Sequence, residues 1–194
     1  MSSQWGGVDR ARRIVTLAAK KFGDDLLRNS CVLMRGKASG LDFIDVLAQR
    51  LDGREVKTAV EIGTCTGLSA AVLACFAEMV VTFDVKPLPS AADLWHTTTV
   101  SNQICQVVMH ADDAKIRMLD RIPFEFAFID GNHHRHAVAA DFVATRKSGL
   151  VLFHDYPWMV NPLNDGADWL VKNGIVDGML AKDSPYLWWE PPSC

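Results

Sequence analysis

Hydrophobic positions along this chain follow two different periods, and the changes between them predict the order of secondary structure. Apolar residues three and four positions apart predict amphipathic helices at 8–22 and 41–51. From residue 58 onward, short apolar runs predict strands at 58–62, 79–84, 104–109, 124–130, 149–154, 176–181 and 186–190. Helical patterns lie between the runs at 68–78, 112–120, 134–147 and 164–173, with a loop or a weak helix at 91–103.

Five apolar strands that alternate with helices predict an α/β fold with a doubly wound, mostly parallel sheet. Continuous apolar runs such as FAFI and LVLF are typical of strands buried on both faces. No helix separates the last two of the seven strands, so we expect a hairpin that adds an antiparallel strand at the C-terminal edge. A length of 194 residues fits one domain, 1–194, with a core at 56–194. The helices within 1–55 are expected either to cover a site or to form a dimer interface.

Composition narrows the class of protein. The chain is 49% hydrophobic and 22% charged, which is ordinary for a globular protein, and no apolar run reaches the length of a membrane helix. The N-terminal residues lack the apolar stretch of a secretory signal. Five cysteines without a C-x-x-C pair predict reduced thiols and a cytoplasmic protein. A net charge of −3 without a basic stripe gives no support for nucleic-acid binding.

The segment VEIGTCTG, residues 60–67, carries the clearest functional signal. A strand, a tight glycine turn and a helix start together form a cradle for a nucleotide cofactor. The dinucleotide pattern G-x-G-x-x-G fails here, because Cys65 and Leu68 stand where glycines are needed. The pattern that fits is an acid followed by two glycines, Glu61, Gly63 and Gly67. A nicotinamide-dependent oxidoreductase is therefore a weaker hypothesis.

Each of the first five strands ends at an acidic residue or is followed by one. These residues are Glu61, Asp84, Asp112, Asp130 and the pair His154-Asp155. Ligands of such sheets bind outside the carboxyl ends of the strands, so we expect the five ends to face one crevice. Asp84, 23 residues after Glu61, is placed to accept the two hydroxyls of a ribose.

The VEIGTCTG motif resembles motif I of the class I S-adenosylmethionine (SAM) methyltransferases, with Cys65 in place of the usual middle glycine. The resemblance implies a SAM cofactor whose amino-acid end lies near Glu61, and a cofactor-binding loop that includes Gly63, Thr64 and Gly67. It also implies that Asp112 lies beside the adenine, although the adjacent Asp113 is an alternative. The seven-stranded sheet with an antiparallel C-terminal strand is typical of the same family.

Residues 124–156 resemble the small-molecule O-methyltransferase branch, especially the group with an I-D-G-D-H motif and a later H-D pair. By this resemblance Asp130, His154 and Asp155 occupy the positions of ligands to a divalent cation such as Mg²⁺ or Mn²⁺. His154 stands where an acid is usual in the catechol-type methyltransferases, which favours a softer ion or no metal. The motif also departs at Asn132, where Asp is common. His133, three residues after Asp130, occupies the position of the general base. His154 has a second reading, as a structural hydrogen-bonding residue.

The predicted function is therefore SAM-dependent methylation of a hydroxyl group on a small molecule, with catalytic residues His133 and Asp130 and with or without a divalent cation. Two alternatives stay open. A related enzyme that does not methylate would keep the cradle and the acidic patch. A catalytically silent SAM-binding subunit would keep Glu61 and Asp84 without needing His133. We expect no nucleic-acid or membrane partner, and a homodimer is compatible with the helices of residues 1–55.

Overall fold

The computed structural model describes residues 5–23, 25–26, 30, 32, 42–51, 53–109, 112–154, 166–176 and 186–191. The α-helices of these ranges are α1 (Trp5–Phe22), α3 (Phe43–Leu51), α4 (Leu68–Leu73), α5 (Pro89–Thr97), α6 (Asp112–Leu119), α7 (Arg135–Thr145) and α8 (Gly166–Lys172). Short 3-10 turns occur at η2 (Ser101–Gln103) and η3 (Arg146–Ser148). The strands are β1 (Thr58–Ile62), β2 (Met79–Asp84), β3 (Ile104–Val108), β4 (Phe126–Ile129), β5 (Val151–Phe153) and β6 (Leu187–Trp189).

The strands form one sheet in the order β3-β2-β1-β4-β5-β6. All neighbours are parallel except β5 and β6, which are antiparallel. This confirms the predicted doubly wound α/β sheet and its antiparallel C-terminal edge. Six strands lie in the described residues, whereas the sequence predicts seven. Of the predicted strand 176–181, Val176 lies in no regular element and the rest falls outside the described residues.

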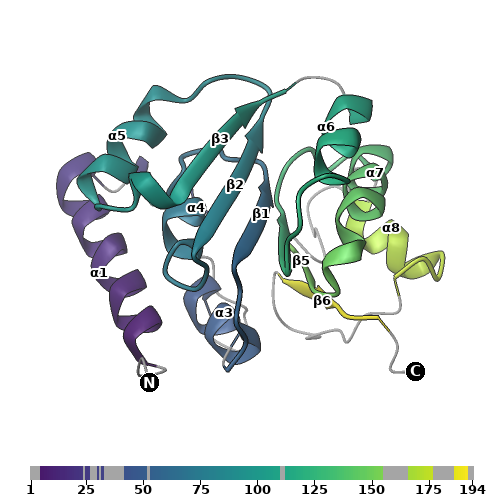
Figure 1. The fold of residues 1–194 in the computed structure, drawn as a ribbon, viewed down its shortest axis with the longest axis horizontal. Helices are drawn as coiled ribbons and strands as arrows, with labels where there is room; N and C mark the ends of the chain where they lie inside the picture. Colours follow the sequence, from purple (N-terminus) through teal and green to yellow (C-terminus); the bar gives the residue numbers. More distant parts are fainter. Residues whose placement is uncertain are drawn as a thin grey trace.

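Helices cover both faces of the sheet, and Figure 1 shows α1, α3, α4 and α5 on one side and α6, α7 and α8 on the other. The alternation of side chains along β1 explains the two cores. Ala59 packs with the helices of the first group, and Val60 packs with those of the second. Glu61 follows in the alternation and therefore lies on the face of α4.

Element ends differ from the predicted ones by a few residues, and the largest difference is in α4. The sequence predicts this helix over 68–78, but it ends at Leu73. The N–H groups of Cys75 and Phe76 bond to the carbonyls three residues earlier, so the last turn tightens and the chain leaves the helix. The segment 91–103, predicted as a loop or weak helix, contains α5 and η2. Pro89 starts α5, a position where its missing N–H is harmless.

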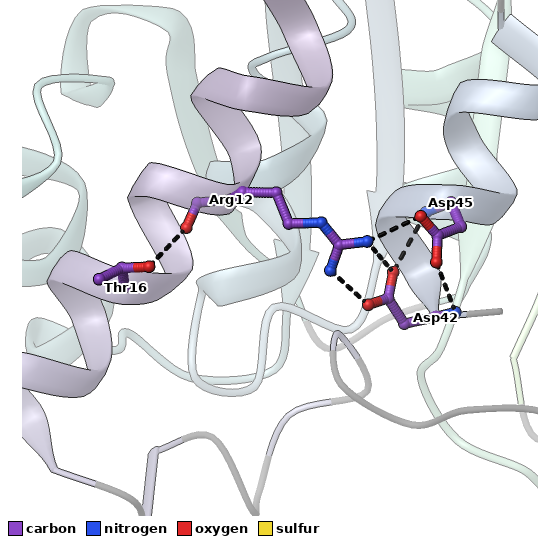
Figure 2. Close-up of polar contacts among 4 residues, drawn as sticks. All are labelled: Arg12, Thr16, Asp42 and Asp45. Atoms are coloured by element: carbon purple, nitrogen blue, oxygen red, sulfur yellow. Dashed lines mark hydrogen bonds and ion pairs between the residues drawn. The ribbon is translucent and has the colours of Figure 1, made fainter. Parts of the chain in front are cut away.

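A cluster of charged residues joins α1 to the start of α3 (Figure 2). The Arg12 guanidinium donates to Asp42 Oδ2 at 2.6 Å and to Asp45 Oδ1 at 2.7 Å. Asp42 and Asp45 also cap α3, because each carboxylate accepts the backbone N–H of the other at 3.1 and 3.4 Å. The Asp42 side chain is fully buried. Both helices thus contribute to the main core; their predicted role as a lid or a dimer interface stays a prediction.

No helix in the described ranges combines the length and the apolar character needed to cross a membrane. The three cysteines among the described residues, Cys65, Cys75 and Cys105, are not part of disulfide bonds.

Candidate functional site

The loops after β1 and β4 meet at the carboxyl edge of the sheet. Strand β1 pairs with β2 on one side and with β4 on the other, so the strand order reverses there, and a crevice forms at such a position. A Cβ atom on Gly63 would lie 2.2 Å from the carbonyl oxygen of Asp130, and the φ of Gly63 is 99°. Only glycine fits both conditions. The first glycine of the motif is therefore needed for contact between the two loops.

The other end of the loop rests on α5. Gly67 has a φ of 79°, and a Cβ there would lie 2.6 Å from Ala91 Cβ. The indole N–H of the buried Trp95 donates to the carbonyl of Gly67 at 2.8 Å. Cys65, between the two glycines, has a φ of 46°, which is the left-handed region that glycine adopts freely. The backbone thus keeps the left-handed shape of a glycine loop although a cysteine stands at the position.

Glu61 is completely buried beneath this loop. Its Oε2 accepts the hydroxyl hydrogen of Thr82 at 2.5 Å, while Oε1 has no hydrogen-bond partner among the described residues. Burial raises the pKa of Glu61 to about 8. The hydroxyls of Ser69 and Thr82 lower this pKa, and the charges of Asp130 and Asp84 raise it further. A buried polar atom without a partner is unfavourable, so Oε1 is suited to form a hydrogen bond with a ligand. This fits the predicted place of Glu61 in a cofactor site.

Asp84 lies against the same loop from the end of β2. Its Oδ2 accepts the backbone N–H groups of Thr64 at 3.1 Å and Cys65 at 3.2 Å, and its Oδ1 accepts the N–H of Val85 at 2.8 Å. The structure thus brings Asp84 to the cradle, as the sequence predicts. Its contact with a ribose stays a prediction.

The electrostatics of Cys65 show that three strand ends share one region. Burial raises the pKa of the Cys65 thiol, the N–H of Thr66 opposes this, and the carboxylates of Asp130, Asp84 and Glu61 raise it further. A thiol with a raised pKa is a poor nucleophile, because the thiolate is the reactive form. Cys65 therefore acts through the shape of the loop.

Asp130 and His154 pair across the ends of β4 and β5. The His154 Nδ1 lies 2.9 Å from Asp130 Oδ1, and the two side chains are 4% and 15% exposed. The imidazole lies 5.2 Å from the ring of Tyr186 and 6.4 Å from that of Phe128, between ring centroids. His154 is thus enclosed, and Asp130 is the member of the pair with more solvent exposure. This supports the reading of His154 as a hydrogen-bonding residue at the strand end.

The same pair bears on the predicted metal site. While Nδ1 and Oδ1 bond to each other they cannot both bind one ion, and His154 Nε2 is buried. Among the described residues, no group of three or more His, Cys, Asp or Glu side chains could hold a metal ion. Asp155, the third predicted ligand, lies outside these residues. The described side chains as arranged do not fit a divalent cation.

Hydrogen bonds hold the loop after β4 in place. Asn132 Oδ1 accepts the N–H of His134, the N-cap residue of α7, at 3.0 Å. The carbonyl of His133 accepts the N–H of Gly166 at 3.0 Å. His133 is half-buried, whereas His134 and His136 are exposed at the start of α7. His133, Asn132 and His154 contribute to the lining of a cavity of about 10 Å³, which has room for about one water molecule.

Two sequence predictions cannot be followed to their side chains. Asp112 is the first residue of α6, but its side chain is outside what the structure describes, so its contact with adenine stays a prediction. Asp155, the third predicted ligand of a cation, falls in the range 155–165, which the structure does not describe.

Sequence reasoning missed Thr82. This residue is fully buried in the middle of β2, lies opposite Glu61 and bonds to it. The available signal was a single hydroxyl within the apolar run MVVTFD, in register with the only acid of β1.

Comparisons with known proteins agree with this geometry. A family model described as a methyltransferase domain matches residues 60–156, which is half of the chain. No curated protein sequence matches the chain. Among solved structures, a putative caffeoyl-CoA O-methyltransferase from Staphylococcus aureus has a TM-score of 0.63 at 18% identity, over 92% of this chain and 96% of that one.

Two further structures share the fold. An O-methyltransferase from Bacillus cereus, in complex with SAH, has a TM-score of 0.60 at 15% identity, over 94% of this chain and 90% of that one. The O-methyltransferase TomG from Streptomyces achromogenes, in complex with SAM, has a TM-score of 0.55 at 21% identity, over 71% and 74%. The match of the family model to half of the chain shows that this protein belongs to the methyltransferase domain family.

Proposed function

We propose that this protein is a SAM-dependent O-methyltransferase that acts on a hydroxyl group of a small molecule. The observation that carries the proposal is the contact between two loops at the reversal point of the sheet. The glycine loop after β1 touches Asp130 after β4, and a partnerless atom of Glu61 lies beneath it. Solved structures with this fold include O-methyltransferases in complex with SAM and SAH.

Bound SAM would supply an electrophilic methyl group on its sulfonium sulfur. The chain would hold the cofactor with Gly63, Thr64 and Gly67 of the loop, with Glu61 Oε1 and with the carboxylate of Asp84. We assign the adenine contact to Asp112. Alignment of the two reactants is the main contribution that such a site makes to the rate.

The acceptor hydroxyl must lose its proton during transfer. We assign this role to His133 as general base, with Asp130 orienting the acceptor from the same loop. The support is their common loop: Asp130 keeps 15% of its side chain exposed, while His154 holds its Oδ1 at 2.9 Å. His154 itself is nearly enclosed and serves to orient Asp130.

The first test is binding, by isothermal titration with SAM, SAH and NAD. We expect micromolar affinity for SAM and SAH, and none for NAD. Tight binding of NAD with no binding of SAM would contradict the proposed function and support the oxidoreductase alternative.

The second test is turnover. SAH release is measured with a panel of small phenols, catechols and aliphatic alcohols. Asp130→Asn and His133→Ala are each expected to lower kcat by about 100-fold, the usual range for a general base, with SAM affinity close to wild type. His136→Ala, on the exposed first turn of α7, is the control. SAM binding without turnover of any acceptor would support the catalytically silent alternative.

Assays with and without EDTA, and with Mg²⁺, Mn²⁺ or Zn²⁺ added back, test the predicted cation. Loss of activity with EDTA and recovery with one metal would assign Asp155 and the Asp130–His154 pair to a metal site. The cytoplasmic location and the absence of nucleic-acid and membrane partners remain proposals, which composition supports. A homodimer also remains a proposal, which the helices of residues 1–55 support.

A further inference from the structure

Thr82 is the one polar residue between the ends of β2, since Val80, Val81 and Phe83 are apolar and buried. It is fully buried and lies directly opposite Glu61 of β1. Its hydroxyl oxygen is 2.5 Å from Glu61 Oε2 and 2.7 Å from the hydroxyl of Thr64. Thr82 therefore connects the acid of the motif to the glycine loop.

The direction of the hydrogen bonds follows from the number of hydrogens. Thr82 has one hydroxyl hydrogen and donates it to Glu61, so the hydroxyl of Thr64 donates to Thr82. All three residues are completely buried. Hydroxyls in such a place are unfavourable unless they are hydrogen-bonded, so the chain Thr64–Thr82–Glu61 restricts the side chain of Thr64 to one orientation.

Thr64 is also held through its backbone. Its N–H donates to Asp84 Oδ2 at 3.1 Å, and its carbonyl accepts the N–H of Gly67 at 2.7 Å. The next residue, Cys65, must take a left-handed φ of 46°. An L-residue in that region is strained, so the loop needs fixed points on either side of it. Thr64 is the fixed point on the β1 side, and Thr82 holds its side chain.

We propose that Thr82 is a positioning residue for the cofactor: through Thr64 it holds loop 63–67 in the shape that receives SAM. The proposal rests on the proposed function for its ligand, and on the described hydrogen bonds for its geometry. In the simpler alternative, Thr82 fills space in the sheet and its hydroxyl has no effect on the loop.

Thr82→Val tests this, because valine keeps the shape of threonine and removes the hydroxyl. We expect a SAM Kd about 10- to 100-fold weaker, as expected when a buried bond of this kind is lost, with kcat at saturating SAM within twofold of wild type. Thr82→Ser restores the hydroxyl and is expected to bind SAM nearly as well as wild type. Thr145→Val in α7 is the matched control, since Thr145 is also fully buried and hydrogen-bonded.

A double-mutant cycle asks whether the two hydroxyls act as one chain. Thr64→Val, Thr82→Val and the double variant are expected to lose the same SAM affinity, because each breaks the same chain. Additive losses, or a folded Thr82→Val protein with wild-type affinity, would overturn the proposal. If Thr82→Val does not fold, Thr82→Ala, which also removes the hydroxyl, takes its place in the cycle.

Hydrogen exchange separates this proposal from the proposed function. In the ligand-free protein, Thr82→Val is expected to speed exchange at the amides of Thr64, Cys65 and Gly67, while Thr145→Val leaves them unchanged. If wild type fails to bind SAM but the exchange result holds, the proposed function fails and the positioning role stands. Equal exchange in wild type and Thr82→Val removes the positioning role whatever the ligand is.

Discussion

At the scale of single residues, the departure from the family motif at Cys65 is a matter of backbone conformation. The usual middle glycine is replaced, yet the backbone keeps a positive φ of 46°. A side chain in that conformation is destabilising by about 1–2 kcal/mol relative to an unstrained one. The substitution thus alters the strain of the loop and leaves its path unchanged.

Cys65→Gly should therefore stabilise the protein, by about 0.5–1 kcal/mol after the greater flexibility of glycine in the unfolded chain is included. Urea unfolding measures the effect. Cys105→Gly, the same substitution in β3, is the control and should destabilise by a similar amount, because glycine weakens an extended strand. A loss of stability in both Cys65→Gly and Cys105→Gly would contradict the claim that the backbone is strained at Cys65.

The second prediction for single residues concerns Glu61 and the pH dependence of stability. Its pKa rises from an ordinary 4.5 to about 8 in the fold because it is buried. The folded chain then keeps a proton that the unfolded chain releases above pH 4.5. The unfolding free energy should fall as the pH rises from about 4.5 to 8, since the unfolded state binds fewer protons there.

The glutamine in Glu61→Gln cannot ionise, so the unfolding free energy of this variant should not fall between pH 4.5 and 8. Its stability relative to wild type should therefore increase by a few kcal/mol over this pH range. Urea unfolding at pH 5, 6, 7 and 8 measures it. Glu78→Gln, at an exposed position, controls for the removal of one charge. Parallel curves for wild type and Glu61→Gln would show that Glu61 is ionised in the fold at all these pH values.

At the scale of elements, the contact between α1 and α3 depends on one arginine. Arg12 donates to Asp42, which is fully buried, and to Asp45 (Figure 2). Burial lowers the pKa of Arg12 and the two carboxylates raise it, with a net rise. Removal of the arginine would leave a buried carboxylate without its cationic partner.

Arg12→Ala should lower the unfolding free energy by about 2–3 kcal/mol, below the range for fully buried pairs because Arg12 is 39% exposed. Arg13→Ala, at the exposed neighbouring position, should have an effect within about 0.5 kcal/mol of zero. Thermal and urea unfolding compare them. Equal losses in the two variants would mean that the ion pairs add nothing to the packing of the helices.

At the scale of the whole molecule, the site is an arrangement of strand ends. Binding of SAM would join loops that follow β1, β2 and β4, so a ligand that engages them stabilises the folded chain as a unit. The unfolding free energy should rise by about 2.7 kcal/mol at a SAM concentration 100 times its Kd. Thermal unfolding with SAM, SAH and NAD measures this, and we expect no shift with NAD. An equal shift with all three ligands would indicate unspecific binding.

The predicted fold agrees with the structure because its signals are local and repeated. Apolar runs predict strands, helical spacing predicts the helices between them, and the missing helix before the last strand predicts the antiparallel edge. Helix ends were less predictable, as α4 shows, because the tightening of its last turn depends on packing beyond the helix. Local pattern also placed Glu61, Gly63 and Gly67, whose types follow from the turn between strand and helix.

By itself, the sequence determined the strand-and-helix order, the glycine turn and the acids at the strand ends, because these depend on neighbours along the chain. Only the tertiary structure decided which of those groups meet. Pairing of β1 with β2 placed Thr82 against Glu61, and pairing of β4 with β5 joined Asp130 to His154. Such contacts join residues about 20 positions apart in the sequence, so they depend on the register of the sheet. The linear pattern of apolar and polar residues does not show that register.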